Sequence, residues 1–571
     1  MSARASSASP SAGLVARTGG QVLIDQLRIH GTDHIFGVPG ESYLAALDAL
    51  HDARNAIKFV ICRQEGGASN MAEAYGKLMG RPGVCFVTRG PGATNASIGV
   101  HTGFQDSTPM IVLVGQVARD QEEREAFQEI DYRRMFGPMT KWVAQIEDAR
   151  RIPELVSQAF HRAMSGRPGP VVLALPEDML ADVVEVADAG PYKVVRGAPD
   201  PEDMARLATL LADASSPLVM LGGGGWTKQA TDDIRAFIET NELPVATAFR
   251  NADLVDNRHP NYLGNLSSGA SAYLQKRIRE SDLILAVGPR LGEQTSGGYT
   301  LFDIPIPRQA LVHVHGGADE LGRVYQASLP INSGMAQFAR AAKAMAPVAR
   351  RPWAVATKEG NDAYLATLES PATGATVDMA IIVRWLNERL PKDAIVTNGA
   401  GNYAGWVSRF FQYRGLRSQL APTSGAMGYG VPAGVSAKIV QPDRMVVTFA
   451  GDGCFLMNGQ EFATAVQYGA PVIVVVVDNG MYGTIRMHQE REYPTRIMGT
   501  ELRNPDFAVY ARAFGGHGET VTRTDEFAPA FERAVASKVP SILHVKVDPD
   551  QVSPRTTLMQ VREAALKRTT T

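Results

Sequence analysis

The sequence predicts an α/β protein built from three doubly wound domains, each with a parallel sheet. Short apolar runs alternate with helix-compatible segments in three successive blocks of the chain. The apolar runs end in glycine-rich turns, and this alternation is typical of parallel sheets covered by helices. A length of 571 residues also indicates several domains rather than one. We place the blocks at residues 19–190, 200–346 and 377–550.

Composition excludes several classes of function. The net charge of −2 gives no reason to expect nucleic acid or an anionic membrane as a partner. No apolar run approaches the roughly 20 residues of a membrane helix. Cys62, Cys85 and Cys454 lack a CxxC spacing, so we expect reduced thiols in a cytoplasmic protein. Residues 1–18 contain no acids and are predicted to be a disordered tail, with a short transit-like segment as the alternative.

The first block contains an informative strand-helix junction. The segment Phe59–Gly80 is predicted to form a strand and then a helix, with Glu65 at the junction beside Gly66 and Gly67. An acid at this place is commonly a solvated first-turn residue, which is the alternative to a functional role. The other predicted elements of this block are a helix at 19–31, strands at 35–37, 84–88, 110–117 and 168–179, and a turn and helix at 89–106.

The second block has the same alternation but no clear binding motif. Gly222–Gly225 follow a strand, yet they lack the G-x-G-x-x-G spacing of a dinucleotide site. Residues 347–376 are interpreted as a linker. The predicted elements are helices at 201–214 and 230–241 and strands at 217–225, 244–249, 282–290 and 310–322.

In the third block, polar residues follow two strands that a helix connects. The strand at 446–449 leads into Gly451-Asp452-Gly453, and the strand at 472–477 leads into Asp478-Asn479-Gly480, with a helix predicted at 460–468. Parallel strands joined by a helix end at the same sheet edge, so Asp452 and Asn479 should lie side by side. A carboxylate and an amide oxygen suit Mg²⁺, and the glycines and a following helix N-terminus favour a phosphate group. We therefore predict a Mg²⁺-diphosphate site; a surface turn beside a buried strand is the alternative.

These motifs resemble those of thiamin-diphosphate enzymes. The GDG turn followed by Asn479 is similar to their metal fingerprint, and RQEGGASNMAEAYGKLMGRPGVCFVTRGPGATN resembles their pyrimidine-binding domain. The resemblance covers about residues 19–550 and implies pyrimidine-binding, central Rossmann-like and diphosphate-binding domains. It implies metal ligands at Asp452, Asn479 and the carbonyl oxygen of Met481. The family usually has Asn-Asn where this chain has Asp478-Asn479.

The same resemblance implies a role for individual residues around the coenzyme. Glu65 matches the glutamate that contacts N1′ of the aminopyrimidine, which promotes loss of the thiazolium C2 proton and formation of the ylide. Met427 would support the bent coenzyme, and the carbonyl of Gly425 would accept a hydrogen bond from its 4′-amino group. The remaining predicted cofactor-binding residues are Gly401, Asn402, Tyr403, Gly453, Cys454, Tyr482 and Gly483.

Within the superfamily the chain most resembles acetolactate synthase. The likeness rests on RQEGGASNMAEAYG, VTRGPGATN, AFQEID (126–131), Lys141 and GAMGYGVP, and Gln128 matches a polar pocket residue. Pyruvate-decarboxylase relatives carry adjacent histidines that protonate the enamine, whereas HTGFQDSTPM contains only His101. A surviving enamine favours carboligation. Gln128 and Tyr482 are predicted to shape the donor pocket.

Departures from the synthases concern the acceptor pocket and the central domain. Met487-His488 replaces a Gln-Trp pair, and His488 is either a catalytic acid or a surface residue. Arg290 matches a flavin-contacting arginine, but residues 292–294 and 316–317 depart from the flavin pattern. FAD is therefore doubtful, and ADP, CoA or no ligand are the alternatives. The tail at 551–571 has a basic helical pattern, interpreted as a solvated helix or as a lid or CoA-phosphate contact.

The leading hypothesis is a 2-oxo acid decarboxylase and carboligase that uses thiamin diphosphate and Mg²⁺. A 2-hydroxyacyl-CoA lyase or benzaldehyde-lyase-like enzyme with the same coenzyme is the alternative, and a non-catalytic nucleotide-binding protein is a remote one. The resemblance also implies a homodimer or homotetramer with its active site at the subunit interface.

Overall fold

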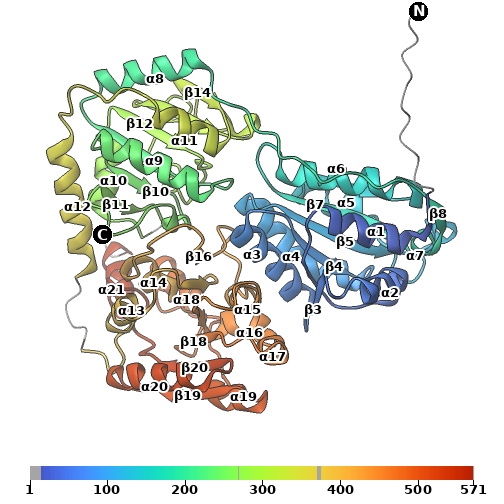
Figure 1. Cartoon of the computed structure of the whole chain (residues 1–571). Coiled ribbons are helices and arrows are strands. Elements are labelled where there is room, and N and C mark those ends of the chain that lie inside the picture. Colours follow the sequence, from blue (N-terminus) through green and yellow to red (C-terminus); the bar gives the residue numbers. More distant parts are fainter. Residues whose placement is uncertain (1–13, 268, 370–373, 570–571) are drawn as a thin grey trace, which may run out of the picture.

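The computed structural model of the chain describes residues 14–267, 269–369 and 374–569. It contains three six-stranded sheets whose strand pairs are all parallel, with helices packed on their faces (Figure 1). The predicted α/β class is therefore confirmed, and each sheet lies within one of the three blocks. Among the described residues, no helix is long and apolar enough to cross a membrane.

The first sheet has the order β3-β2-β4-β5-β7-β6. Helix α3 (Glu65–Met79) begins where the Gln64 side chain accepts hydrogen bonds from the N–H groups of Gly66 and Gly67. It ends at Gly80, whose φ of +68° is in the left-handed region. Strand β6 was not predicted because this partly exposed edge strand lacks a continuous apolar run. The strands are β2 (His34–Gly37), β3 (Lys58–Ile61), β4 (Gly83–Val87), β5 (Met110–Gln116), β6 (Trp142–Gln145) and β7 (Pro170–Pro176).

The N-terminal tail is partly ordered. Residues 1–13 of the predicted tail lie outside the described residues. Residues Ala16–Thr18, which the prediction also assigned to the disordered tail, form strand β1 and pair with β8 (Val183–Glu185) in an antiparallel ladder. The Arg17 guanidinium helps to hold strand β1 in place, because it forms an ion pair with Asp25 at 2.7 Å.

The central sheet has the order β11-β10-β9-β12-β13-β14. The segment predicted to be a linker contains helix α12 (Ala354–Leu368). This helix packs on the central domain, where Asn361 donates hydrogen bonds to the carbonyls of Tyr262 and His259 at 2.8 and 3.2 Å. The strands are β9 (Pro217–Leu221), β10 (Val245–Thr247), β11 (Tyr262–Asn265), β12 (Leu283–Val287), β13 (Ala310–His315) and β14 (Leu329–Asn332).

The third sheet has the order β16-β15-β17-β18-β20-β19. Strand β17 (Val446–Gly451) runs parallel to β18 (Ile473–Asp478), and Gly451 is paired with Val477, so both strands end at one edge. The connection contains two short helices, α16 (Asp452–Asn458) and α17 (Glu461–Gln467), whereas only the second was predicted. The other strands are β15 (Ile395–Asn398), β16 (Gln419–Leu420), β19 (His517–Val521) and β20 (Ser541–Lys546).

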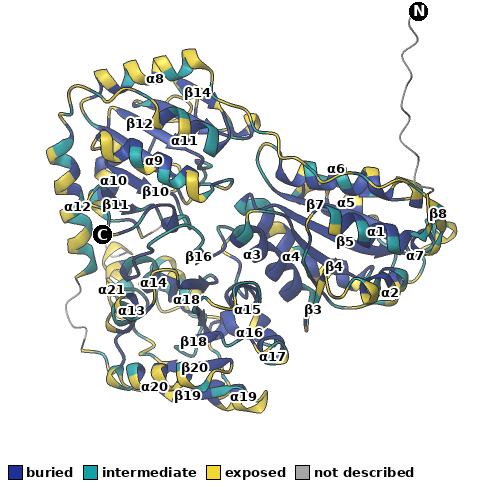
Figure 2. Ribbon diagram, in the orientation of Figure 1, coloured by how far each residue is buried: buried dark blue, intermediate teal, exposed yellow. Residues whose placement is uncertain are grey.

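The first and third domains share one hydrophobic core. Helix α3 packs against α15 (Gly430–Val440), and both helices are buried along most of their length (Figure 2). A polar contact crosses the same boundary, because the buried Tyr429 hydroxyl donates to Glu73 at 2.6 Å. The two domains therefore form one packed body, although the central domain separates them in sequence.

Glu461, at the start of α17, anchors the turn that precedes α3. Its fully buried carboxylate accepts hydrogen bonds from the backbone N–H groups of Arg63 and Gln64, both at 3.0 Å. The approach is close enough that a Cβ on Gly67 would lie 2.4 Å from a Glu461 oxygen. Burial raises the pKa of Glu461 to about 7. The third domain thus holds the backbone immediately before Glu65.

Replacing Glu461 with alanine is expected to lower the thermal unfolding midpoint by roughly 2–3 °C. The change leaves two backbone N–H groups without their acceptor, a loss of about 2 kcal/mol. Differential scanning calorimetry of the full chain measures it. Tyr468→Phe, at the opposite end of α17, is a milder control, since it removes only the hydroxyl contacts to Ile61 and Phe59. An equal midpoint for wild type and Glu461→Ala would contradict the anchoring role.

Candidate active site

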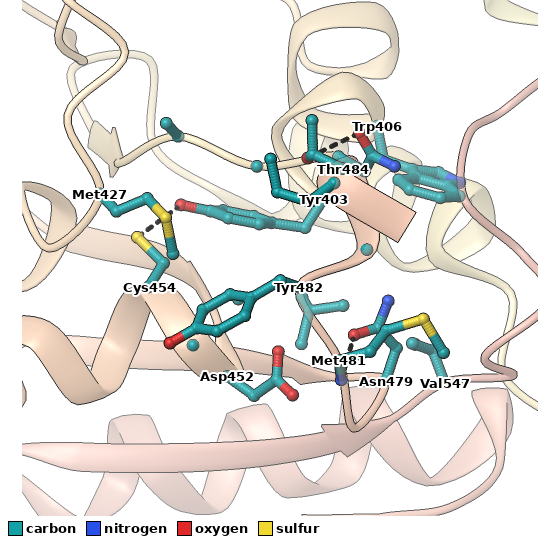
Figure 3. Close-up of a pocket in the computed structure, with 18 of the residues that line it drawn as sticks. Tyr403, Trp406, Met427, Asp452, Cys454, Asn479, Met481, Tyr482, Thr484 and Val547 are labelled. Atoms are coloured by element: carbon teal, nitrogen blue, oxygen red, sulfur yellow. Dashed lines mark hydrogen bonds between the residues drawn. The ribbon is translucent and has the colours of Figure 1, made fainter. Parts of the chain in front are cut away.

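A cavity of about 260 Å³ opens at the carboxyl ends of β15, β17 and β18. All its lining residues come from the third domain and the segment that follows it. Every predicted cofactor-binding residue except Glu65 lines this cavity, and Figure 3 shows how several of these side chains converge. The position agrees with the general rule that open α/β sheets bind ligands at their strand ends.

Asp452 is a buried carboxylate without a cationic partner among the described residues. It is the first residue of α16, and its side chain is only 3% exposed. The amide of Asn504 donates to Asp452 at 2.7 Å and to Asp478 at 2.8 Å. Asp478 is also paired with His544 at 2.8 Å, but Asp452 has no such partner. Burial raises the pKa of Asp452 to about 6.

The donors around Asp452 fit a divalent cation bound together with a phosphate group. Asn479 and Met481 line the same cavity, and the Asn479 amide oxygen accepts a hydrogen bond from the Met481 N–H at 3.3 Å. The described residues contain no group of three or more His, Cys, Asp or Glu side chains that could hold a metal alone. One carboxylate, one amide oxygen and a carbonyl leave coordination positions that water or phosphate oxygens can fill. The N-terminus of α16 favours the same anion.

Glycines shape the wall that faces this site. A Cβ on Gly453 would lie 2.6 Å from the Tyr482 ring, and one on Gly451 would lie 2.9 Å from the Tyr403 ring. Gly401 has a φ of +143°, which only glycine adopts readily. The absence of side chains at these positions lets the rings and the backbone approach the cavity closely.

Tyr403, Cys454 and Met427 form the largely apolar side of the cavity (Figure 3). The Tyr403 hydroxyl accepts a hydrogen bond from the Gly399 N–H at 3.0 Å and lies 3.3 Å from the Cys454 sulfur. Burial raises the pKa of the Cys454 thiol, so this cysteine acts as a packing group rather than a thiolate. Asn402 accepts a hydrogen bond from Thr484 at 2.9 Å, which links two loops that line the cavity.

Glu65 and Gln128 lie together, but apart from this cavity. Asn95, near the start of α4 (Pro91–Asp106), donates to the Glu65 carboxylate at 2.9 Å. Gln128 packs against Gly90, the residue that caps the start of α4, and its buried side-chain oxygen has no hydrogen-bond partner among the described residues. Neither residue lines the third-domain cavity. One chain therefore contains two groups of predicted site residues that it does not bring together.

Two other predicted residues lie away from the cavity. His488 is exposed on α18 (Gly483–Glu492) and is not among the lining residues, so its catalytic role stays a prediction. Arg290 forms an ion pair with Glu320 at 3.4 Å and donates to the carbonyl of Gln105 at 3.0 Å. These contacts leave the flavin prediction untested.

Sequence comparison defines the class of protein that this fold and site represent. The chain matches the N-terminal, central and C-terminal domains of thiamine pyrophosphate enzymes over residues 17–135, 204–342 and 399–545; the outer two are described as TPP-binding. The protein is thus a thiamin-diphosphate enzyme.

Its relatives narrow this class further. It is 34% identical to the acetolactate synthase large subunit of Parasynechococcus marenigrum, over 93% of this chain and 87% of the relative. It is 30% identical to the Escherichia coli acetolactate synthase isozyme 2 large subunit, over 93% and 95% of the two chains. A probable acetolactate synthase large subunit of Methanocaldococcus jannaschii is also 30% identical, over 94% and 93%. The chain belongs to the acetolactate synthase large-subunit family.

Proposed function

We propose that this protein is a decarboxylating carboligase of the acetolactate synthase type, acting on a 2-oxo acid with thiamin diphosphate and Mg²⁺. The observation that carries the proposal is the buried Asp452 carboxylate, which has no cationic partner in the described part of the chain and faces a cavity at the strand ends. The family of the chain supplies the reaction class. No feature of the cavity favours the lyase alternatives.

In this proposal the third domain binds one end of the coenzyme. Asp452, Asn479 and the Met481 carbonyl would hold Mg²⁺, while Gly401, Asn402 and the N-terminus of α16 would hold the diphosphate. Bound thiamin diphosphate supplies a carbon nucleophile. The Tyr403, Cys454 and Met427 side keeps water away from that centre.

Glu65 is the acid that the proposal assigns to the pyrimidine end of the coenzyme. It would hold the proton at N1′, while Asn95 fixes the orientation of its carboxylate. Glu65 does not line the cavity of its own chain, which supports a homodimer in which a second copy completes each site.

The activity is tested with pyruvate, thiamin diphosphate and Mg²⁺. Carbon dioxide release and product mass are followed together. We expect one carbon dioxide for each acetolactate formed, and Asp452→Ala is expected to form neither product. Release of carbon dioxide with acetaldehyde as the only product would contradict carboligation, and cleavage of a 2-hydroxyacyl-CoA in place of pyruvate turnover would favour the lyase alternative.

The subunit arrangement is tested by mixing two inactive variants, Glu65→Gln and Asp452→Ala. After subunit exchange, half of the dimers contain one chain of each kind, and one of their two sites has both residues intact. We therefore expect about one quarter of the wild-type activity to return. Mixing Glu65→Gln with itself is the control. No recovery, despite subunit exchange confirmed by mass spectrometry, would place both residues in one chain.

A further inference from the structure

A second, larger cavity of about 660 Å³ adjoins the coenzyme cavity. The two cavities share Gly401, Asn402 and Thr484 among their lining residues. The second cavity lies between α14 (Ala404–Phe410) of the third domain, residues 265–267 and 269–271 of the central domain and the segment at 552–556. A molecule in this cavity would therefore have direct access to the coenzyme.

The charged side chains in the described lining of this second cavity are all positive. Its described lining includes Arg250, Arg409, Arg491 and Arg555 but no aspartate, glutamate or lysine. The other lining residues include hydroxyl and amide side chains such as Asn265 and Ser408. Four guanidinium groups without an acid make a positive surface that attracts anions.

None of these four arginines forms an ion pair with the described acids. Arg409 donates to the carbonyl of Thr367 at 2.8 Å, and Arg555 donates to the carbonyl of Gly269 at 3.2 Å. Arg491 has no side-chain partner among the described residues, and the buried Nε of Arg250 has no hydrogen-bond partner there either. Nearby arginines behave differently, since Arg562 and Arg486 both pair with the buried Glu490.

Arg409 and Arg555 line the same part of this cavity. Arg409 lies on α14, and the segment that carries Arg555 contacts that helix, because a Cβ on Gly405 would lie 3.7 Å from the Pro554 ring. Burial lowers the pKa of Arg409, and the neighbouring charge of Arg555 lowers it further. Two like charges held together without an acid are stabilised when an anion binds between them.

We propose that this cavity is a subsite for an anionic group on the acceptor substrate, with Arg409 and Arg555 as its main ligands. The proposal rests on the carboligase function above. Arg409 is six residues along α14 from Tyr403, about 9 Å at the helical rise. A carboxylate bonded to the reacting carbonyl carbon stays beside that carbon and cannot extend to Arg409. The acceptor would therefore carry a second anionic group, a carboxylate or a phosphate, at its other end.

The test compares acceptors of different charge with pyruvate as donor. The acceptors are 2-oxobutyrate with one anionic group, 2-oxoglutarate with two carboxylates, and glyceraldehyde 3-phosphate with a phosphate. We expect the KM of the wild type for either 2-oxoglutarate or glyceraldehyde 3-phosphate to be lower than its KM for 2-oxobutyrate. The acceptor with the lowest KM identifies carboxylate or phosphate as the recognised group. Arg409→Gln and Arg555→Gln should each raise that KM about tenfold, with kcat and the KM for 2-oxobutyrate changed less than about twofold.

Arg384→Gln is the matched control. Arg384 and Arg409 both stack on the Phe410 ring, at 6.0 and 5.3 Å, but Arg384 lies outside the cavity. It should leave every KM unchanged. Equal effects of Arg409→Gln on all acceptors, or no preference of the wild type for a doubly charged acceptor, would overturn the proposal.

A binding experiment separates this proposal from the proposed function. Calorimetric titration of the full chain with inorganic phosphate and with succinate, each at low salt, needs no turnover. We expect one of the two anions to bind the wild type, and binding to weaken about tenfold in Arg409→Gln. Binding without carboligation would reject the function and keep the anion site. Carboligation with no arginine-dependent binding would reject the anion site alone.

Discussion

Replacing Glu65 with glutamine is expected to slow exchange of the coenzyme C2 proton by about 10²–10³-fold. Glutamine keeps the size of the side chain but cannot hold or release the proton at N1′. Coenzyme affinity should change only a few-fold, because the residues proposed to bind the metal and the diphosphate are all in the third domain. Exchange into deuterated water, stopped with acid and read by proton NMR, measures the rate.

The control for this experiment tests whether Glu65 is only a solvated first-turn acid. Glu154 is also a first-turn acid of the first domain, and it pairs with Arg151 on the surface. Glu154→Gln should leave C2 exchange unchanged. If Glu65→Gln behaves in the same way, Glu65 is an ordinary first-turn acid and has no part in the reaction.

Replacing Asp452 with alanine is expected to weaken Mg²⁺-dependent binding of thiamin diphosphate by at least about 100-fold. Asp452 is the only carboxylate proposed as a metal ligand, and removing a charged ligand from a buried site costs about 3 kcal/mol or more. Quenching of intrinsic fluorescence during coenzyme titration gives the affinity with and without Mg²⁺. Asp478→Asn, which restores the amide usual in the family, should have a much smaller effect. If both variants lose the same coenzyme affinity, Asp452 is not a specific metal ligand.

The pH dependence of metal binding follows from the raised pKa of Asp452. Its pKa of about 6 is above the ordinary aspartate value of 3.8. Burial disfavours the ionised form of Asp452. The protonated carboxyl therefore contributes stability that is fully present below about pH 3.8 and is lost as the pH rises through about 6. Because Mg²⁺ needs the ionised form, its affinity should fall about tenfold for each pH unit below 6. A Mg²⁺ affinity that is constant between pH 5 and 7 would contradict this assignment.

The sequence was sufficient to predict the architecture and the sheet edge where the third-domain candidate residues line one cavity. Buried parallel strands are continuous apolar runs, and their glycine-rich ends mark the sheet edge at which ligands bind. The adjacency of Asp452 and Asn479 follows from this topology, and the pairing of Gly451 with Val477 places their strand ends together.

Other parts of the site could not be predicted, because they depend on distant contacts. Asn504 and His544 reach the strand ends from 52 and 66 residues along the chain, and no local pattern marks either one. Helix α16 was missed because only seven residues separate its glycine-rich start from Gly459. The four arginines that form no ion pair with the described acids come together only when four separate segments form one cavity.

The core that α3 and α15 share has a consequence for how the protein is made. About 350 residues separate the end of α3 from the start of α15. During synthesis the newly made first domain therefore presents an uncovered apolar face until the last third of the chain leaves the ribosome. The order of translation thus delays completion of this domain, and the nascent chain is most prone to aggregation while the central domain is being made.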